Sequence, residues 1–113
     1  MSNSNSYYQR EHLRQFPDIS ELNENLGGKF FDYYNAVFEG DQLSAREKAL
    51  IALAVAHTVQ CPYCIDAYTD ASLQNGISEE EMMESVHVAC AIRGGASLVH
   101  SVQMMNQAKK KSM

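Results

Sequence analysis

The sequence contains no tryptophan, only two prolines and only six glycines among its 113 residues. So few turn-forming residues disfavour an all-β sandwich or barrel, which needs a turn signal roughly every 8–12 residues. The longest apolar run, residues 49–56, is eight residues long, whereas a membrane-spanning helix needs about 20. The first residues are polar and lack the apolar stretch of a secretory signal. We therefore expect a soluble, cytoplasmic protein with no membrane partner.

Basic residues are also scarce. Nine Lys and Arg stand against fourteen Asp and Glu, so the net charge is −5. An acidic chain of this kind is a poor binder of nucleic acid, and we expect no such partner. The length fits one domain with a real core, which needs no metal or disulfide to fold.

The residues that are abundant in the second half, Ala and Met among them, favour helices. Two capping boxes, Ser44 to Glu47 and Ser78 to Glu81, mark helix starts. Pro62 suits the first position of another helix, which makes Cys61 its N-cap. We predict an all-α, single-domain bundle of five or six helices over residues 18–113, preceded by a polar N-terminal arm, residues 1–17.

The expected helices are bounded by glycines and caps. Residues 18–26 form a short helix that Gly27 and Gly28 end, and residues 29–38 form an amphipathic helix. The helix that follows Ser44 runs to about Val59, and it is apolar on every side over residues 49–56, so we expect it to be buried all round. The helix after Ser78 runs to about Arg93, where a pair of glycines breaks it, and a last helix covers residues 96–108.

Three cysteines are present, and two of them, Cys61 and Cys64, form a Cys-x-x-Cys pair. An odd count without a secretory signal does not indicate a structural disulfide framework. A thiol at a helix N-terminus meets unpaired backbone N–H groups and the positive end of the helix dipole, and both stabilise the thiolate. The placement therefore favours redox chemistry in which Cys61 attacks and Cys64 resolves the intermediate as a disulfide.

Two other interpretations of the cysteine pair stay open. One is half of a zinc site, completed by two of four candidates: Cys90, His57, His87 and His100. None of these forms a second close pair, which disfavours a metal. The other is a chance pair with no redox role. Cys90 itself lies on an apolar helix face and is expected to be a buried small hydrophobe.

Two residues are candidates to move protons for the thiols. Glu47 precedes Cys61 by fourteen residues, nearly four turns, so a continuous helix would put both on one face. His57 lies one turn before Cys61. Each has a structural alternative: Glu47 completes a capping box, and His57 suits a core histidine bonded to a backbone carbonyl.

Residues 43–101 resemble the carboxymuconolactone decarboxylase family, and most closely its alkylhydroperoxidase D-like branch, which carries Cys-x-x-Cys. The shared features are the Arg-Glu pair that opens the long helix, the cysteine pair, the Asn-Gly turn, the acidic helix start and the Gly-Gly pair. The run CPYCIDAYTD is similar to a subgroup described as arsenosugar-biosynthesis-associated peroxidase-like proteins. The resemblance implies trimers or hexamers, and it implies thiol-dependent reduction of hydroperoxides or disulfide exchange with a partner protein.

The chain departs from the branch at two positions. The branch has a histidine four residues after the second cysteine, where this chain has Tyr68, a poor base that can still donate a hydrogen bond to a thiolate or peroxide oxygen. The slot of the branch's relay glutamate is Ala49, two residues after Glu47. The resemblance also implies that the inner cysteine meets the peroxide and the outer one the reductant, whereas the helix dipole favours Cys61 as the attacking thiol.

We predict a homo-oligomeric enzyme, a peroxidase-type thiol oxidoreductase, in which Cys61 and Cys64 cycle between dithiol and disulfide. Glu47, Tyr68 and His57 assist. Its partners are a small-molecule peroxide and a dithiol reductant protein, and no metal or organic cofactor is implied. The alternatives are a non-catalytic oligomeric protein that binds a small ligand or serves as an accessory, and a lactone decarboxylase.

Overall fold

The computed structural model describes residues 8–112 of the chain, and all of its regular structure is helical. Over this range there are six α-helices and one 3₁₀ helix, which confirms the predicted all-α class. Residues 1–7 of the expected N-terminal arm and residue 113 lie outside the described residues. The elements are α1 (Arg10–Arg14), η1 (Phe16–Leu22, the 3₁₀ helix), α2 (Glu24–Glu39), α3 (Ala45–Val59), α4 (Pro62–Gln74), α5 (Glu79–Val99) and α6 (Ser101–Ser112).

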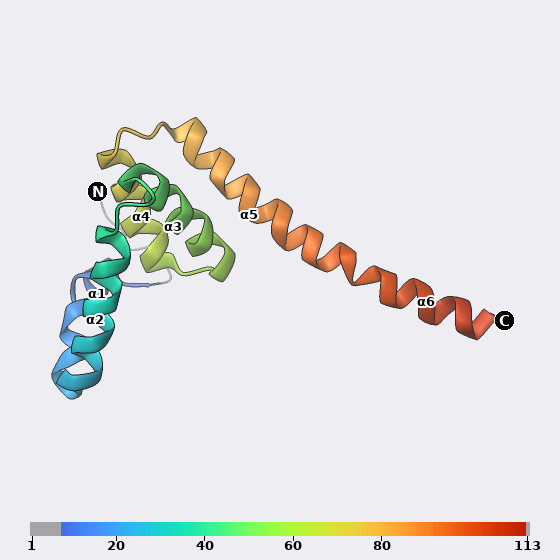
Figure 1. Ribbon diagram of the computed structural model, residues 1–113, viewed down its shortest axis with the longest axis horizontal. Coiled ribbons are helices and arrows are strands. Elements are labelled where there is room, and N and C mark those ends of the chain that lie inside the picture. The colour runs from blue at the N-terminus through green and yellow to red at the C-terminus, as the bar shows by residue number, and fades with distance from the viewer. Residues whose placement is uncertain (1–7, 113) are drawn as a thin grey trace.

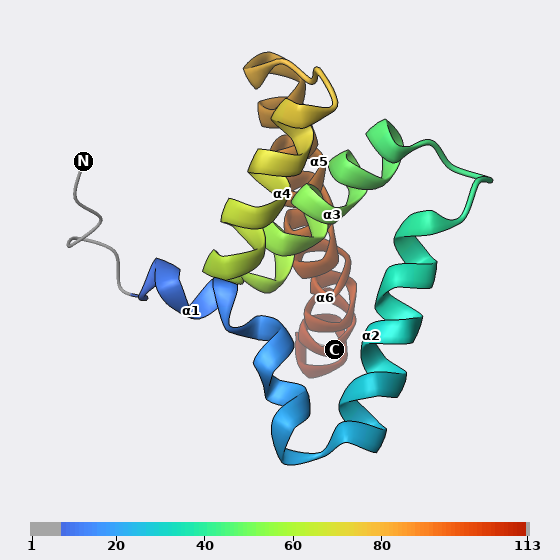
Figure 2. The ribbon, with the colours of Figure 1, turned by 90° about the vertical axis from the view of Figure 1, so that its left-hand side faces the viewer.

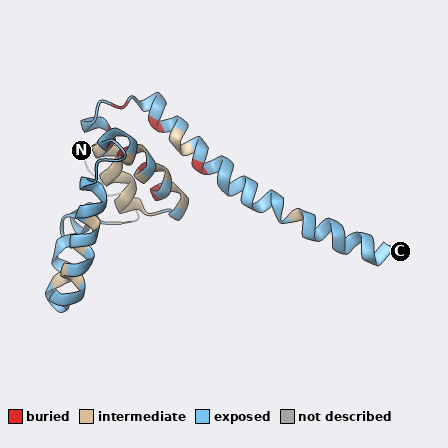
Figure 3. Ribbon diagram, viewed as in Figure 1, coloured by how far each residue is buried: buried red, intermediate tan, exposed pale blue. Residues whose placement is uncertain are grey.

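The core lies where α3 packs against α4 and the first turns of α5. Its buried apolar cluster consists of Ala49, Leu53, Ile77 and Met82. Figure 3 shows that the buried residues among those described lie in α3, in α4, just before α5 and in the first half of α5. Ile77 and Met82, which flank the second capping box in the manner of a hydrophobic staple, are thus both part of the core.

The capping boxes form as predicted. In the first, the Glu47 backbone N–H donates to Ser44 Oγ at 3.0 Å, and the Ser44 N–H donates to Glu47 Oε1 at 2.8 Å. In the second, the Glu81 N–H donates to Ser78 Oγ at 3.1 Å, and the Ser78 N–H donates to Glu81 Oε1 at 3.0 Å. The Arg46 guanidinium donates to the Glu81 carboxylate, so an ion pair joins the starts of α3 and α5.

The expectation that α3 is buried on every side is wrong for the single chain. Leu53 and Ala56 are buried, whereas Ile51 and Val55 each expose about half of their surface, 50% and 53%. The reason is that α4 and α5 cover only one side of α3. The other side is open, and it forms one wall of a cavity described below.

The N-terminal elements also differ from expectation. Residues 16–22 form a 3₁₀ helix, and α2 begins at Glu24, where the Asn23 side chain accepts the Leu26 N–H at 3.0 Å. The helix then continues through Gly27 and Gly28 instead of ending there. Gly27 serves a close approach, because a Cβ at this position would lie 2.7 Å from Ser20 Cα. It lets η1 lie beside α2, as Figure 2 shows.

The predicted break at Gly94 and Gly95 is wrong, since α5 continues to Val99 and the interruption falls at His100. Glycine costs a helix about 1 kcal/mol but does not forbid it, and among the described glycines only Gly76 has a positive φ. As a result α5 and α6 form a long rod that leaves the core (Figure 1). In residues 8–112 we find no helix that combines the length and the hydropathy needed to cross a bilayer.

Replacing Leu53, whose side chain is 2% exposed, tests the core. We expect Leu53→Ala to lower the free energy of unfolding by about 2–5 kcal/mol, because the change leaves a cavity among α3, α4 and α5. Leu73→Ala, at a side chain that is 54% exposed, is the matched control and should cost far less. Chemical denaturation at one protein concentration measures both. Equal losses would contradict this description of the core.

Candidate active site

Cys61 stands at the turn between α3 and α4. Gln60 adopts a left-handed conformation, φ 58°, that ends α3, and Cys61 is extended, φ −98° and ψ 105°. Its Sγ accepts the backbone N–H of Cys64 at 3.3 Å, so the thiol caps α4 while Pro62 occupies the first helical position. This is the geometry that the sequence predicts, and it places Cys61 where a thiolate is stabilised.

The two thiols are not equivalent. Burial raises the pKa of Cys64 from 9.0 to about 11, and its hydrogen bond and proximity to Cys61 act in the same direction. Cys64 therefore keeps its proton to a higher pH than an ordinary thiol does, and the Cys61 sulfur accepts the Cys64 N–H.

Two cavities share Cys64 as a wall residue. The first, which we call the α2–α3 cavity, has a volume of about 470 Å³ and is lined mainly by apolar side chains of α2 and α3, among them Val37, Phe38, Ile51, Val55 and Val59. The second, which we call the arm-side cavity, has a volume of about 400 Å³ and is walled by α1, η1 and α4. Cys64 lines both cavities, whereas Cys61 lines only the arm-side one.

Tyr68 is the predicted site residue that the structure brings to Cys64, because it too lines both cavities. Its ring stacks on Phe38 at 5.5 Å and 15°, and its hydroxyl forms a hydrogen bond with the hydroxyl of Tyr34. Tyr34 comes from α2 and is the third residue shared by the two cavities. Burial, and then the charges of Cys64 and Cys61, raise the pKa of Tyr34 above its ordinary value.

Sequence reasoning missed Tyr34. The residue lies on the apolar face of the helix expected over residues 29–38, where the pattern predicts a side chain that packs against the core. The available signal was a hydroxyl in the middle of that face, because a buried hydroxyl needs a hydrogen-bond partner. Which partner it finds depends on how α2 meets α4, and no local pattern encodes that.

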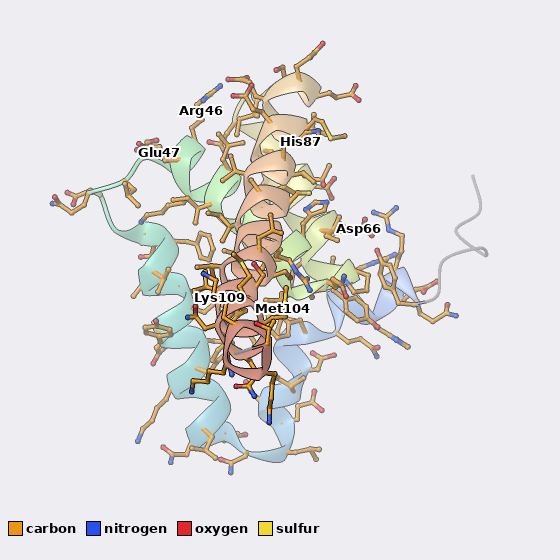
Figure 4. The ribbon with its side chains drawn as sticks, turned by 90° about the vertical axis from the view of Figure 1, so that its right-hand side faces the viewer. Arg46, Glu47, Asp66, His87, Met104 and Lys109 are labelled. Carbon is orange, nitrogen blue, oxygen red and sulfur yellow. The ribbon has the colours of Figure 1, made fainter. Side chains whose placement is uncertain are left out.

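The structure does not bring Glu47 to the thiols. Glu47 sits in the first turn of α3 and Cys61 follows its last turn, so about 18 Å of helix axis separates them. Figure 4 shows Glu47 beside Arg46 and far from Asp66, a neighbour of the cysteines on α4. Its carboxylate accepts the Ser44 N–H, and this bond lowers the pKa of Glu47. The described contacts of Glu47 are those of a helix cap.

His57 faces away from the two cavities. Its Nδ1 bonds the Leu53 carbonyl at 2.8 Å, and its ring lines hollows formed with α5 on the other side of α3.

Cys90 is exposed on α5, so the expectation that it is buried is wrong for the single chain. His87 is also exposed on α5, and His100 bonds the Ala96 carbonyl within the rod. Within residues 8–112 no three His, Cys, Asp or Glu side chains gather to hold a metal.

The arm-side cavity owes its outer wall to the N-terminal segment. Arg10 Nε forms an ion pair with Asp66 at 3.1 Å, and His12 Nδ1 lies 3.4 Å from the Tyr63 hydroxyl. These contacts attach α1, part of the predicted arm, to the first turns of α4. The segment therefore lies next to the Cys61 thiol.

Comparison with known proteins agrees with this architecture. The model of the carboxymuconolactone decarboxylase family matches residues 25–107, and the chain belongs to that family. A protein of Paracoccus denitrificans described as uncharacterized protein 4 in the cox locus is 34% identical over 84 residues, which cover 74% of this chain and 76% of that protein. A crystal structure from Methanobacterium thermoautotrophicum is similar at a TM-score of 0.73 and 29% identity, over 76% of this chain and 97% of that one.

The unequal thiols predict an order of alkylation. In a Cys90→Ser background, iodoacetamide at pH 8 should modify Cys61 before Cys64, because a pKa of about 11 leaves Cys64 with about a hundredfold less thiolate than a thiol at its ordinary 9.0. Fragment-ion mass spectrometry locates the label. Faster labelling of Cys64 would contradict the raised pKa of its thiol.

Proposed function

We propose that the protein is a thiol-dependent oxidoreductase in which Cys61 and Cys64 cycle between dithiol and disulfide. The observation that carries this proposal is the hydrogen bond from the Cys64 N–H to Cys61 Sγ, at the N-terminus of α4 and beside the arm-side cavity. The Cys-x-x-Cys pair favours the alkylhydroperoxidase D-like branch of the family. The narrower likeness to arsenosugar-associated peroxidases stays a prediction from the run CPYCIDAYTD.

The reaction begins at Cys61. Its thiolate attacks the terminal oxygen of a hydroperoxide, so that an S–O bond forms, the O–O bond breaks, and Cys61 becomes a sulfenic acid. The leaving alkoxide takes a proton and departs as an alcohol. The mostly apolar cavities at the thiols suit a hydroperoxide with an organic group.

The second step oxidises the Cys64 thiol to a disulfide. Its sulfur attacks the Cys61 sulfur, an S–S bond forms, and hydroxide leaves and becomes water with a proton. A dithiol protein then reduces the disulfide by exchange, which returns both cysteines to thiols and oxidises the partner. Tyr68 is the hydrogen-bond donor nearest this chemistry among the three assisting residues that the sequence predicts, because Glu47 and His57 lie elsewhere.

Hydroperoxide treatment of the reduced protein tests this function. We expect wild type to lose two of its three thiols as a Cys61–Cys64 disulfide, measured by alkylation and intact mass. Cys90→Ser, the control, should still form the disulfide. Cys64→Ser should stop at a sulfenic acid on Cys61, and Cys61→Ser should form neither. Survival of all three thiols in wild type, at the rate of free cysteine, would sink the peroxidase proposal.

We also propose that the protein works as a homo-oligomer, and the shape of the single chain supports this. Its radius of gyration is 19.2 Å, whereas a compact domain of this length has about 13 Å. The α5–α6 rod leaves the core (Figure 1), and its exposed apolar side chains include Val88, Ile92, Leu98, Val99, Val102, Met104 and Met105. Met104 and Lys109 of α6 are labelled in Figure 4.

A charge placed on the rod tests the assembly. Val88, Ile92 and Val99 follow one another at spacings of four and seven residues, so they share one face of α5. Ile92→Glu should shift wild-type oligomers toward monomers in gel filtration with light scattering, because assembly would bury an unpaired carboxylate. Ser97→Glu adds the same charge on another side of α5 and is the control. A wild-type monomer would overturn the proposal.

A further inference from the structure

Tyr34 stands apart from the Cys-x-x-Cys motif, on a different helix, and yet completes its surroundings. It lies on α2, and together with Cys64 and Tyr68 it forms the boundary between the α2–α3 cavity and the arm-side cavity. Its hydroxyl is half-buried and bonded to that of Tyr68. Two phenol groups and the Cys64 thiol thus line both cavities, and the Cys61 thiol lines the arm-side cavity.

Two other titratable side chains on the cavity walls, Lys48 and His12, have contacts of their own. Lys48 Nζ donates to the carbonyls of Val37 and Gly40 at 2.7 and 2.6 Å, which ties it to the end of α2. His12, on the arm, is exposed and lies by Tyr63. Neither carboxylate nor imidazole therefore stands between the tyrosine pair and Cys64 among the described wall residues.

We propose that Tyr34 and Tyr68 act as one proton relay, which first protonates the leaving oxygen of the hydroperoxide and then deprotonates Cys64. The inference rests on the proposed function. In the first step, O–O cleavage gives an alkoxide, and a hydroxyl of the pair gives it a proton. An alcohol leaves, and the pair becomes a phenolate hydrogen-bonded to the remaining phenol.

In the second step, this phenolate takes the proton of the Cys64 thiol, and both tyrosines are neutral again. The Cys64 thiolate then attacks the Cys61 sulfenic acid, the S–S bond forms, and hydroxide leaves to become water. Per turnover the relay neither gains nor loses a proton. The two cysteines supply the two electrons that reduce the hydroperoxide.

The acidities of the groups fit such a relay. The pKa of Tyr34 is raised by burial and by the charges of the two cysteines, so its phenolate is a stronger base than that of an ordinary tyrosine. A neutral tyrosine is a poor base at pH 7. The order of the steps solves this difficulty, because the phenolate is produced by the alkoxide, a much stronger base. The second hydroxyl stabilises the phenolate by a charge-assisted hydrogen bond.

The decisive variant is Tyr34→Phe, compared with Tyr33→Phe on the neighbouring, exposed residue of α2. With cumene hydroperoxide, we expect Tyr34→Phe to form the Cys61–Cys64 disulfide about tenfold more slowly or worse, and Tyr33→Phe to match wild type. Tyr68→Phe should be equally slow, and the double variant should be no slower than either single one, because the hydroxyls act as a unit.

A second oxidant separates proton transfer from structure. Ellman's reagent also drives disulfide formation through Cys61, but its leaving thiolate needs no proton, so Tyr34→Phe should react within about twofold of wild type. Slowing with both oxidants would mean a structural role and overturn the relay, as would normal peroxide turnover by Tyr34→Phe. If wild type forms the disulfide with Ellman's reagent but ignores hydroperoxide, the proposed peroxidase function fails and the relay fails with it.

Discussion

The short turn between α3 and α4 is the constraint on which the site depends. Gln60 is the one described non-glycine residue with a positive φ, and its left-handed conformation stops α3 and redirects the chain within one residue. Cys61 then meets the N-terminus of α4 with its sulfur facing the Cys64 N–H. If α3 continued by one turn, Cys61 would lie within a helix, where its sulfur would have no free amide to accept. The hydrogen bond from the Cys64 N–H to the Cys61 sulfur follows from this turn.

The caps show what local sequence determines. Ser44 and Ser78 were recognisable because the donor, the acceptor and the spacing of three residues all lie within one turn of chain. The same holds for Cys61 and Pro62. These features fixed the starts of three helices correctly, and with them the all-α class. They need no knowledge of what the helices pack against, which is why a single sequence is enough to place them.

The predictions that the structure does not bear out depend, in contrast, on features that extend beyond one turn of chain. The relation between Glu47 and Cys61 rested on angular position around a helix and ignored the length of axis between them. The glycine pair at residues 94–95 predicts a break, although nothing in α5 requires a left-handed residue there. Tyr34 meets Tyr68 across 34 residues of sequence, so its role depends on the packing of α2 beside α4. Cys90 and the open side of α3 are exposed, and their exposure depends on which helices pack over them, which local sequence does not encode.

The small size of the core has a consequence for how this protein would respond to dilution. Six hydrophobic residues are buried among those described, and all of them lie in or directly before α3–α5. If chains associate through the rod, folding and association share the same apolar surface. The folded state then gains stability by mass action as concentration rises. The midpoint of thermal unfolding would then depend on the protein concentration as well as on the chain. At a low concentration in the cell, the cysteine pair would lie in a less ordered environment than at a high one.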